Sequence, residues 1–293
     1  MSIVVNTNIG SLNAQRSLAE SSRELSTAME RLSSGKKINS ASDDAAGFAI
    51  AERMTAQVRG LNMATKNAND GLAMLATIEN ATNDVTDMLQ RVRELAVQAA
   101  NDTNSDTDRE YLQLEVDSLL AEINRVSSQT VYNNQNVLDG SRSGTLQVGT
   151  DNGQTIAFNI ESIDTGALGL TNFEVNDADG NAPGTTGYTS TTSSLSVLDA
   201  GAAAEALDKI SIAIEQVAED RAGYGALANR LEYTVSNLMN VAEFTTAARS
   251  RIEDADFAAE SARLAKAQVL QQTGTAMLAQ ANASSQRAIQ LIR

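Results

Sequence analysis

Apolar residues recur at helical spacing along three long stretches of the chain. The first begins near Ala45 and ends near Ala100, and in its second half the stripe positions lie alternately three and four residues apart. These positions are Leu75, Ile78, Thr82, Val85, Leu89, Val92, Ala96 and Ala99. Turn and cap formers fill residues 101–108, and a second stripe then follows at Leu112, Val116, Leu119, Ile123, Val126 and Thr130. The two stretches predict a helical hairpin.

The third stretch lies far along the chain and keeps the same spacing without a slip. Arg221 is its only charged position. The stripe consists of Ala203, Leu207, Ile210, Ile214, Val217, Arg221, Tyr224, Ala228, Leu231, Val235, Leu238, Ala242 and Thr245. Three long stripes of this type are typical of a coiled-coil-like bundle. We therefore expect the C-terminal half of the chain to return along the N-terminal half.

Both ends of the chain carry narrow apolar stripes as well. The N-terminal stripe consists of Ala14, Leu18, Leu25, Met29 and Leu32, and the C-terminal stripe consists of Leu270, Met277, Ala281, Ala288 and Ile292. We expect the two ends to pair, and a C-terminal helix docked on its own fold is the ordinary interpretation. One pair would leave further apolar positions uncovered, among them Leu12, Leu278, Ile289 and Leu291. These faces are therefore expected to contact copies of the same chain.

The middle of the chain changes character. Ile156, Phe158 and Ile160 share one face of an alternating segment, and the Asn152-Gly153 pair predicts a tight hairpin turn before it. A β-hairpin is expected within about residues 140–170, and a polar, Gly-rich exposed loop within about 172–194.

The predicted fold is thus mainly α, a long coiled-coil-like helical bundle with a small β-hairpin region and paired terminal helices. We expect a terminal helical assembly domain of residues 1–44 and 253–293, and a bundle domain of residues 45–252 that carries the hairpin and the loop.

Composition supports long helices and excludes several partners. Aromatic residues make up 3% of the chain, Trp is absent and Pro occurs once, so a core of large aromatic anchors is not expected. The formal net charge of -15 opposes binding to nucleic acid or to an anionic membrane surface. No apolar run approaches the roughly 18 residues that span a bilayer, and the first residues lack the basic and apolar regions of a secretory signal. We expect no membrane insertion.

The sequence offers no catalytic constellation. Cys and His are both absent, which excludes thiol nucleophiles, Ser-His-Asp triads and Cys/His zinc sites. The stretch at Gly35-Lys36 lacks the first Gly and the Ser or Thr of a phosphate loop, and Asp43 and Asp44 fit helix capping better than an acid pair. Asp177 and Asp179 resemble half of a calcium loop, but the glycine comes too early, at the fourth position and not the sixth. We expect neither an enzyme nor a cofactor, and a carboxylate-dependent hydrolase is the disfavoured alternative.

Long phrases at the two ends closely resemble bacterial flagellin, the filament subunit of the flagellum. The resemblance covers roughly residues 1–138 and 194–293. It is carried by "NTNIGSLNAQRSL", "LSSGKKINSASDDAAGFAIAERM", "LQRVRELAVQAAN", "INRVSSQT" and "RIEDADFAAESARLAKAQVLQQTGTAMLAQAN". The middle is too short for the outer domains of long flagellins, so the chain resembles a short form.

The resemblance implies a self-assembling structural protein of the extracellular bacterial flagellum, which serves swimming motility. In that family the terminal helices pair in the innermost filament layer and the subunit leaves the cell by flagellar type III export. Implied partners are copies of the chain, an export chaperone at the C-terminal region, and the filament cap and hook-filament junction proteins. The alternatives are a hook-filament junction protein and a secreted monomeric immune-active effector.

The resemblance also implies recognition by a vertebrate Toll-like receptor. The positions that match the family's recognition motif are Arg91 and Leu95 in "LQRVRELAVQ", with Glu115 farther along the chain. From the residues alone, Arg91, Arg93 and Glu94 would be a solvated helix face.

Overall fold

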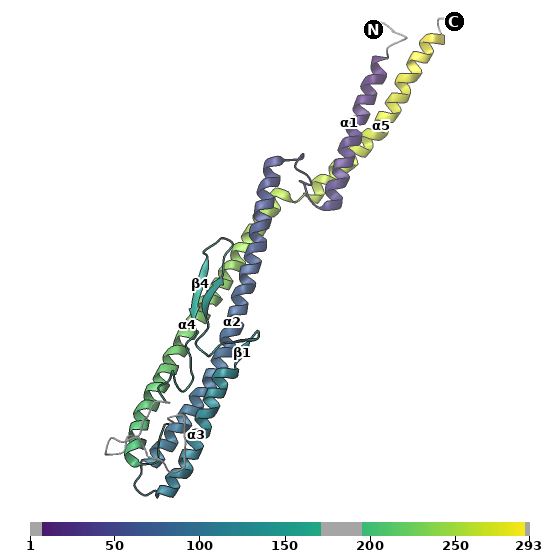
Figure 1. The fold of residues 1–293 in the computed structure, drawn as a ribbon. Coiled ribbons are helices and arrows are strands. Elements are labelled where there is room, and N and C mark those ends of the chain that lie inside the picture. Colours follow the sequence, from purple (N-terminus) through teal and green to yellow (C-terminus); the bar gives the residue numbers. More distant parts are fainter. Residues whose placement is uncertain (1–7, 171–194, 291–293) are drawn as a thin grey trace. The chain divides into compact units, whose positions relative to one another are not determined.

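The computed structural model describes residues 8–170 and 195–290, with side chains described up to residue 283. The helices are α1 (Ile9–Ser34), α2 (Ala45–Ala99), α3 (Asp106–Gln129), α4 (Ala200–Glu253) and α5 (Phe257–Gln290), as Figure 1 shows. The strands are β1 (Val131–Tyr132), β2 (Gln135–Asn136), β3 (Ser143–Gln147) and β4 (Thr155–Asn159). The predicted mainly α fold is confirmed. The loop expected at 172–194 lies outside the described residues.

The chain forms two compact units. We call residues 1–59 and 241–293 the terminal unit, and residues 60–240 the central unit. The boundaries between the units fall inside α2 and α4. The domain boundaries expected from the sequence differ from these: 44/45 lies at the start of α2, and 252/253 lies one residue before the end of α4. They stay a prediction about assembly.

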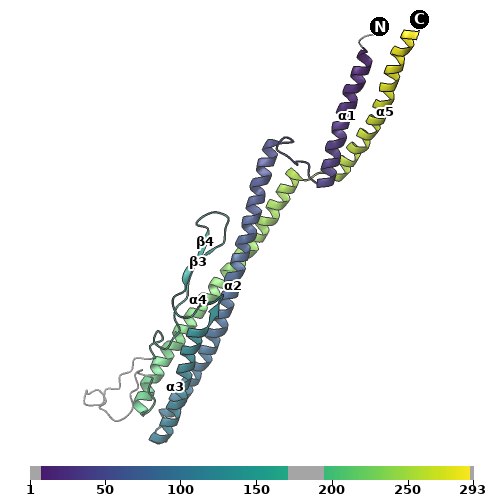
Figure 2. The same cartoon turned by 45° about the vertical axis from the view of Figure 1, so that its right-hand side comes forward.

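The core of the central unit is the seam between α2, α3 and α4, which lie side by side in Figures 1 and 2. The apolar stripe positions predicted on α2 are fully or almost fully buried, and they contact the buried stripes of α3 and α4. Thr82 is tolerated in this seam because its hydroxyl donates to the backbone oxygen of Ile78 at 3.0 Å. Arg221 turns out of the seam, and its Nη2 pairs with Oε1 of Glu79 at 2.7 Å. The predicted helical hairpin and returning helix are confirmed.

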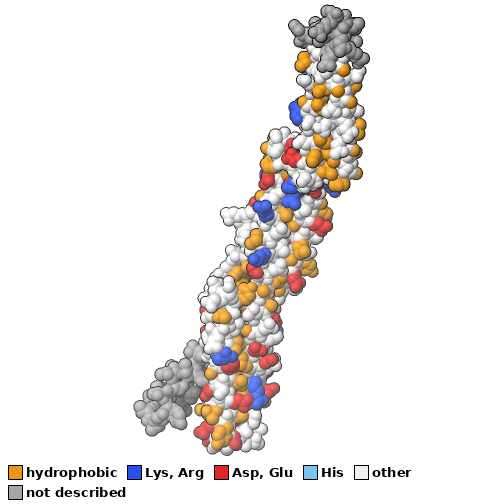
Figure 3. Space-filling view, turned by 90° about the vertical axis from the view of Figure 1, so that its right-hand side faces the viewer, with side chains coloured by type: hydrophobic (Ala, Val, Ile, Leu, Met, Phe, Trp, Pro, Cys, Tyr) orange, Lys and Arg blue, Asp and Glu red, His pale blue; other side chains and the backbone are white. Residues whose placement is uncertain are grey.

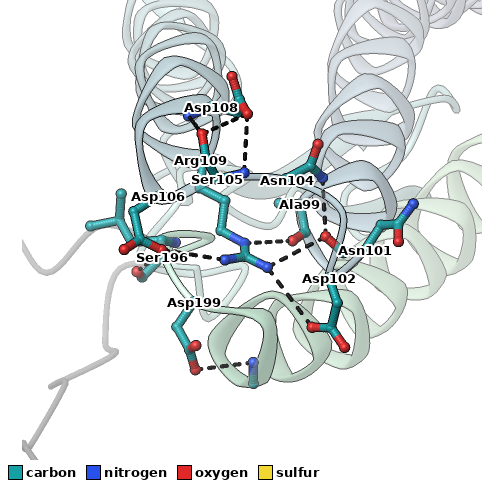
Figure 4. Close-up of polar contacts among 12 residues, drawn as sticks. Ala99, Asn101, Asp102, Asn104, Ser105, Asp106, Asp108, Arg109, Ser196 and Asp199 are labelled. Carbon is teal, nitrogen blue, oxygen red and sulfur yellow. Dashed lines mark hydrogen bonds and ion pairs between the residues drawn. The ribbon is translucent and has the colours of Figure 1, made fainter.

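Arg109 holds the turn between α2 and α3 (Figure 4). Its side chain is buried and donates from Nε to the backbone oxygen of Ala99 at 3.0 Å and from Nη2 to that of Asn101 at 3.4 Å. Ala99 is the last residue of α2, where carbonyls lack helical partners, and Asn101 lies in the turn just beyond it. Asp106 and Asp102 flank the guanidinium at 3.6 and 4.0 Å. Helical spacing alone does not predict this role of Arg109.

Helix α3 begins with a reciprocal capping box. The Ser105 hydroxyl accepts from the backbone N–H of Asp108 at 3.3 Å, and the Asp108 carboxylate accepts from the backbone N–H of Ser105 at 3.0 Å. The hydrogen bonds from the Ser105 hydroxyl and backbone lower the pKa of Asp108. The polar run of residues 101–108 therefore ends one helix and starts the next.

The predicted β-hairpin is present, and its loop is longer than a two-residue connection. Strands β3 and β4 pair antiparallel, and the loop between them spans residues 148–154. The tight turn expected at Asn152-Gly153 lies within this loop, because the N–H of Gln154 donates to the oxygen of Asp151 at 3.3 Å and Gly153 has φ 87°. Asn152 does not have a positive φ, so the strands are not joined directly by a two-residue type I′ turn. The two-residue turn lies at Asn133-Asn134, where φ is 49° and 62°, between β1 and β2. Asn tolerates this left-handed region better than most residues.

The β3–β4 hairpin packs on α2 at two glycines of the helix, Gly60 and Gly71. A Cβ on Gly71 would lie 2.5 Å from Cδ1 of Leu146, and one on Gly60 would lie 2.8 Å from the Thr150 methyl group. Between these glycines, Nδ2 of Asn67 donates to the backbone oxygen of Gln147 at 3.0 Å. Close approach thus accounts for two glycines inside a long helix, where glycine otherwise costs about 1 kcal/mol.

The segment that follows β4 contacts α4 through a buried phenol. The Tyr224 hydroxyl accepts from the backbone N–H of Glu161 at 3.3 Å, and burial raises the pKa of Tyr224 to about 12. Burial also raises the pKa of the neighbouring Asp220, with the negative charges of Glu161 and Glu219 adding to the effect. The Tyr224 hydrogen bond thus joins the hairpin segment to α4, and three acidic residues lie near it: Glu161, Asp220 and Glu219.

We predict that Arg109→Ala destabilises the folded chain by about 2 kcal/mol, because it leaves the buried backbone oxygen of Ala99 without its donor. Urea unfolding followed by circular dichroism measures this change. Arg125→Ala is the matched control, since the Arg125 side chain is half exposed and pairs with Glu122 one helical turn away. That variant should unfold almost as the parent does. Equal midpoints for Arg109→Ala and the parent would show that the turn does not need the guanidinium.

Candidate interaction surfaces

The terminal unit is built around the helices α1 and α5, which run antiparallel and in contact (Figures 1 and 2). Asn8 caps α1 and also joins it to α5. Its Oδ1 accepts from the backbone N–H of Ser11 at 3.1 Å, and its Nδ2 donates to the backbone oxygen of Ala281 at 3.0 Å. The predicted pairing of the terminal helices is confirmed.

The seam of this pair consists of small residues. Ser11, Ser21 and Ala28 are the described residues of α1 that are buried, and Ala267 is buried on α5. Gly274 sets the spacing further along, because a Cβ there would lie 3.3 Å from Cδ1 of Leu18. Small residues let the two helices approach closely, but they remove little apolar area from water.

Three of the larger apolar residues of the predicted stripes stay exposed in this pairing. Met277 is 63% exposed, Met29 is 56% exposed and Leu270 is 40% exposed. The half-buried members are Ala14, Leu18, Leu25, Leu32, Leu278 and Ala281. Ala288 and Ile289 lie in the last turns of α5, where side chains are not described. Ile292 lies outside the described residues. The helix pair therefore carries an apolar face that its own fold leaves open.

Two grooves run along the α1–α5 pair. One, of about 340 Å³, is lined by Ala14, Ser17, Leu270, Gly274 and Met277 among others, so exposed stripe residues form its walls. The other, of about 500 Å³, is polar and contains an ion-pair network. Its centre is Glu260, 5% exposed, which accepts from Nη1 of Arg31 at 3.4 Å and from Nη1 of Arg263 at 3.1 Å. This network ties the base of α1 to α5.

The connections between the helices of the terminal unit are also paired. The backbone N–H of Lys37 donates to the oxygen of Glu253 at 2.6 Å, and that of Ala255 donates to the oxygen of Gly35 at 2.9 Å. Asp44 caps α2, since its Oδ1 accepts from the backbone N–H groups of Ala46 and Gly47 at 3.1 and 3.0 Å. The capping role predicted for this acid is confirmed.

Asp43 stabilises the loop before α2. Its carboxylate accepts from the backbone N–H groups of Ser40 and Asn39, each at 3.0 Å. These bonds, with that of Ser40 the stronger influence, lower the pKa of the carboxyl. Both carboxylates therefore accept backbone hydrogen bonds at or just before the start of α2, as the capping interpretation predicts.

Charge is divided unevenly between the two units. Residues 60–240 contain 26 Asp and Glu against 9 Lys and Arg, whereas the terminal unit contains 11 against 13. Apolar side chains lie along the α1–α5 pair in Figure 3. The terminal unit is thus the part of the chain that copies can approach without strong electrostatic repulsion.

A second candidate surface lies on α2 and α3 in the central unit. Arg91 is exposed, and it donates from Nε to Oε1 of Glu115 and from Nη1 to Oε2 of Glu94, both at 2.9 Å. These hydrogen bonds, first that of Glu115, raise the pKa of Arg91. Val97 on α2 and Leu114 on α3 are exposed apolar residues of the same two helices.

Leu95 does not share this surface. Its side chain is 1% exposed and belongs to the core of the central unit. The structure therefore brings Arg91 and Glu115 together and separates the third position of the implied recognition set from them. Helical spacing could have indicated this, because Leu95 lies three residues after Val92 and one before Ala96, both of which are stripe positions.

In the described part of the chain, no three acidic residues are grouped so that they could hold a metal ion. No described helix is long and apolar enough to cross a membrane.

Comparison with known proteins gives consistent matches over the whole chain. Two family models match, the bacterial flagellin N-terminal helical region over residues 5–143 and the bacterial flagellin C-terminal helical region over residues 207–292. A flagellin of Halalkalibacterium halodurans is 38% identical over 292 residues, covering 99% of this chain and 100% of the relative. The flagellar filament 33 kDa core protein of Treponema phagedenis is 38% identical over 302 residues, with coverage of 99% and 100%.

A solved structure extends the comparison to the fold. A putative flagellar hook-associated protein from Vibrio parahaemolyticus is similar with a TM-score of 0.56 at 14% identity, covering 72% of this chain and 100% of that one.

Proposed function

The chain belongs to the bacterial flagellin family, and on this premise we propose that it is the structural subunit of the extracellular flagellar filament. Copies of the chain assemble into a helical homopolymer that serves swimming motility. The family is structural and not enzymatic, and the subunit needs no cofactor. The name of the relative from Treponema phagedenis, a filament core protein, supports this role.

The observation that carries the proposal is the open apolar face of the α1–α5 pair. Met277, Met29 and Leu270 remain exposed although the two helices already contact each other. Exposed apolar faces of this kind mark protein interaction sites. The near balance of charge in the terminal unit fits packing between identical copies, since identical surfaces of high net charge would repel.

We assign the inner filament layer to residues 1–44 and 253–293, with the following interface residues. They are Ala14, Leu18, Leu25, Met29, Leu32, Leu270, Met277, Leu278, Ala281, Ala288, Ile289 and Ile292. The subunit leaves the cell by flagellar type III export. An export chaperone binds the C-terminal region, and the filament cap and hook-filament junction proteins contact the assembled subunits. Family membership supports these partners.

A hook-filament junction protein is the alternative within the same fold. The likeness to a putative hook-associated protein concerns the fold alone, so it does not separate the two roles. Identity of 38% over the whole chain to a flagellin and to a filament core protein favours the filament subunit. A secreted monomeric effector would leave the apolar face of the terminal unit without a partner.

A second proposed function is recognition by a vertebrate Toll-like receptor through Arg91 and Glu115. The specific observation in its favour is that these two side chains, from α2 and α3, form one exposed ion pair. Leu95 supports the position of α2 from the core and is not proposed to contact the receptor.

We predict that Met277→Asp prevents filament formation while the melting temperature of the monomer stays nearly unchanged. The side chain is exposed in the free chain, so a carboxylate there meets water, but it would be buried between subunits. Burial of an unpaired charge costs about 3 kcal/mol or more, which raises the critical concentration at least about a hundredfold. Sedimentation and electron microscopy measure the polymer.

Met277→Leu is the matched control and should form filaments as the parent does, because it keeps apolar area at the same place. Normal filaments from Met277→Asp would remove this face from the interface. A parent chain that stays in the supernatant at every concentration and salt condition would contradict the filament role itself.

For recognition, we predict that the double variant Arg91→Ala, Glu115→Ala lowers receptor signalling by monomers about tenfold or more, as expected for the loss of a central contact pair. Reporter cells that express the receptor measure the response. The control is Arg125→Ala with Glu122→Ala, another ion pair on the surface of α3. Equal losses in both variants, or a marked fall in melting temperature, would show that the first pair acts through the fold.

A further inference from the structure

We propose that Asn152 is a site of spontaneous covalent modification, at which the side-chain amide is lost and an aspartyl or isoaspartyl residue forms. This proposal goes beyond assembly and receptor recognition, and it concerns the loop between β3 and β4. Asn152-Gly153 is the only Asn-Gly pair in the 293 residues. Asn is among the thermally labile residues of proteins.

The reaction needs the backbone nitrogen of residue 153 to reach the side-chain carbon of Asn152. In the first step, the deprotonated N of Gly153 attacks Cγ, the N–Cγ bond forms, the Cγ–Nδ2 bond breaks and ammonia leaves. Water then opens the five-membered imide at either carbonyl and gives the aspartyl or the isoaspartyl product. Water is the only co-reactant and no electrons are exchanged, so the step requires nothing that the solution does not hold.

The structure leaves both reacting groups accessible. Asn152 and Gly153 are exposed, and within the described residues neither the Asn152 side chain nor the Gly153 N–H has a hydrogen-bond partner. A Cβ placed on Gly153 would meet no atom within 4 Å, so the imide ring has open space on that side. Gly153 also lacks the side chain that would shield its nitrogen in any other residue.

The backbone groups on either side of Asn152-Gly153 form hydrogen bonds that close the loop. The N–H of Val148 donates to the oxygen of Gln154 at 3.0 Å, and that of Gln154 donates to the oxygen of Asp151 at 3.3 Å. The Gln154 side chain also bonds Asp151, accepting from its backbone N–H and donating to its carboxylate, both at 3.3 Å. The oxygen of Gly153 also accepts from the N–H of Thr155 at 3.0 Å. These hydrogen bonds close the loop around the pair without using the two groups that react, the Asn152 side chain and the Gly153 N–H.

The product would disturb the place where the loop meets α2. An isoaspartyl residue adds one carbon to the backbone of a loop closed by short hydrogen bonds, and either product adds a carboxylate next to Asp151. Thr150, two residues earlier, packs on α2 at Gly60. Modification should therefore loosen the hairpin loop from the helix and make the acidic central unit more acidic still.

The test is to hold the purified full-length chain at mildly alkaline pH and follow peptides by mass spectrometry. Isoaspartyl residues are identified with a protein isoaspartyl methyltransferase. The internal reference is Asn104, whose Nδ2 donates to the backbone oxygens of Gln98 and Asn101. We expect the Asn152 peptide to deamidate at least about tenfold faster than the Asn104 peptide, which corresponds to about 1.4 kcal/mol in barrier.

A synthetic peptide of residues 147–156 separates the effect of the fold from that of the sequence. The proposal expects the folded chain and the peptide to react at comparable rates, and Asn152→Gln to give no product in the folded chain. A folded chain that reacts much more slowly than the peptide, or an Asn152 that is no faster than Asn104, would overturn the proposal.

Discussion

The structure depends on one constraint, which is that the terminal helix pair closes on small residues. Ser11, Ser21, Ala28 and Ala267 fill the seam between α1 and α5, while Met277 and Met29 stay in water. At roughly 25 cal/mol per Å² of apolar area, such a seam contributes little against the ~1–2 kcal/mol that ordering each residue costs. The central unit differs, because its seam buries Ile78, Val85, Leu89, Val92 and their partners completely. The chain thus joins a bundle with a well-buried core to a helix pair that leaves larger apolar side chains exposed, and the proposed assembly would cover these side chains.

The two units also differ in their balance of acidic and basic residues. The central unit has an excess of acids, whereas the terminal unit is almost balanced, so the surfaces that copies would share are the ones with the least repulsion. The ion pairs of the terminal unit are internal: Glu260 holds Arg31 and Arg263 at the base of the α1–α5 pair. Those charges keep the two helices in register and leave the apolar face clear. In the central unit, the exposed pair of Arg91 and Glu115 presents a polar surface of a different kind.

Most of the fold could be predicted from the sequence because its signals are long and periodic. Helix α2 was expected from Ala45 to about Ala100 and runs from Ala45 to Ala99, and Asp44 caps it as its position suggested. What escaped prediction depends on particular distant contacts. Arg109 reaches back to the end of α2, Gly60 and Gly71 admit the hairpin, and the loop at Asn152 is longer than the dipeptide alone indicates. For the interaction surfaces, the stripes predict helices α1 and α5, and several of the stripe residues are exposed there. The buried residues of the described α1–α5 seam include small ones between the stripe positions, such as Ser21 and Ala28, and Leu95 lies in the core of the central unit.

The most direct test of this account is amide hydrogen exchange on the free chain and on the assembled polymer. The account predicts that the amides of α1 and α5 exchange quickly in the monomer and become protected in the polymer, while those of α2 from residue 75 to residue 99 are protected in both. Terminal amides that are protected in the monomer as strongly as those of α2 would contradict it. That result would mean that the α1–α5 pair is complete without other copies.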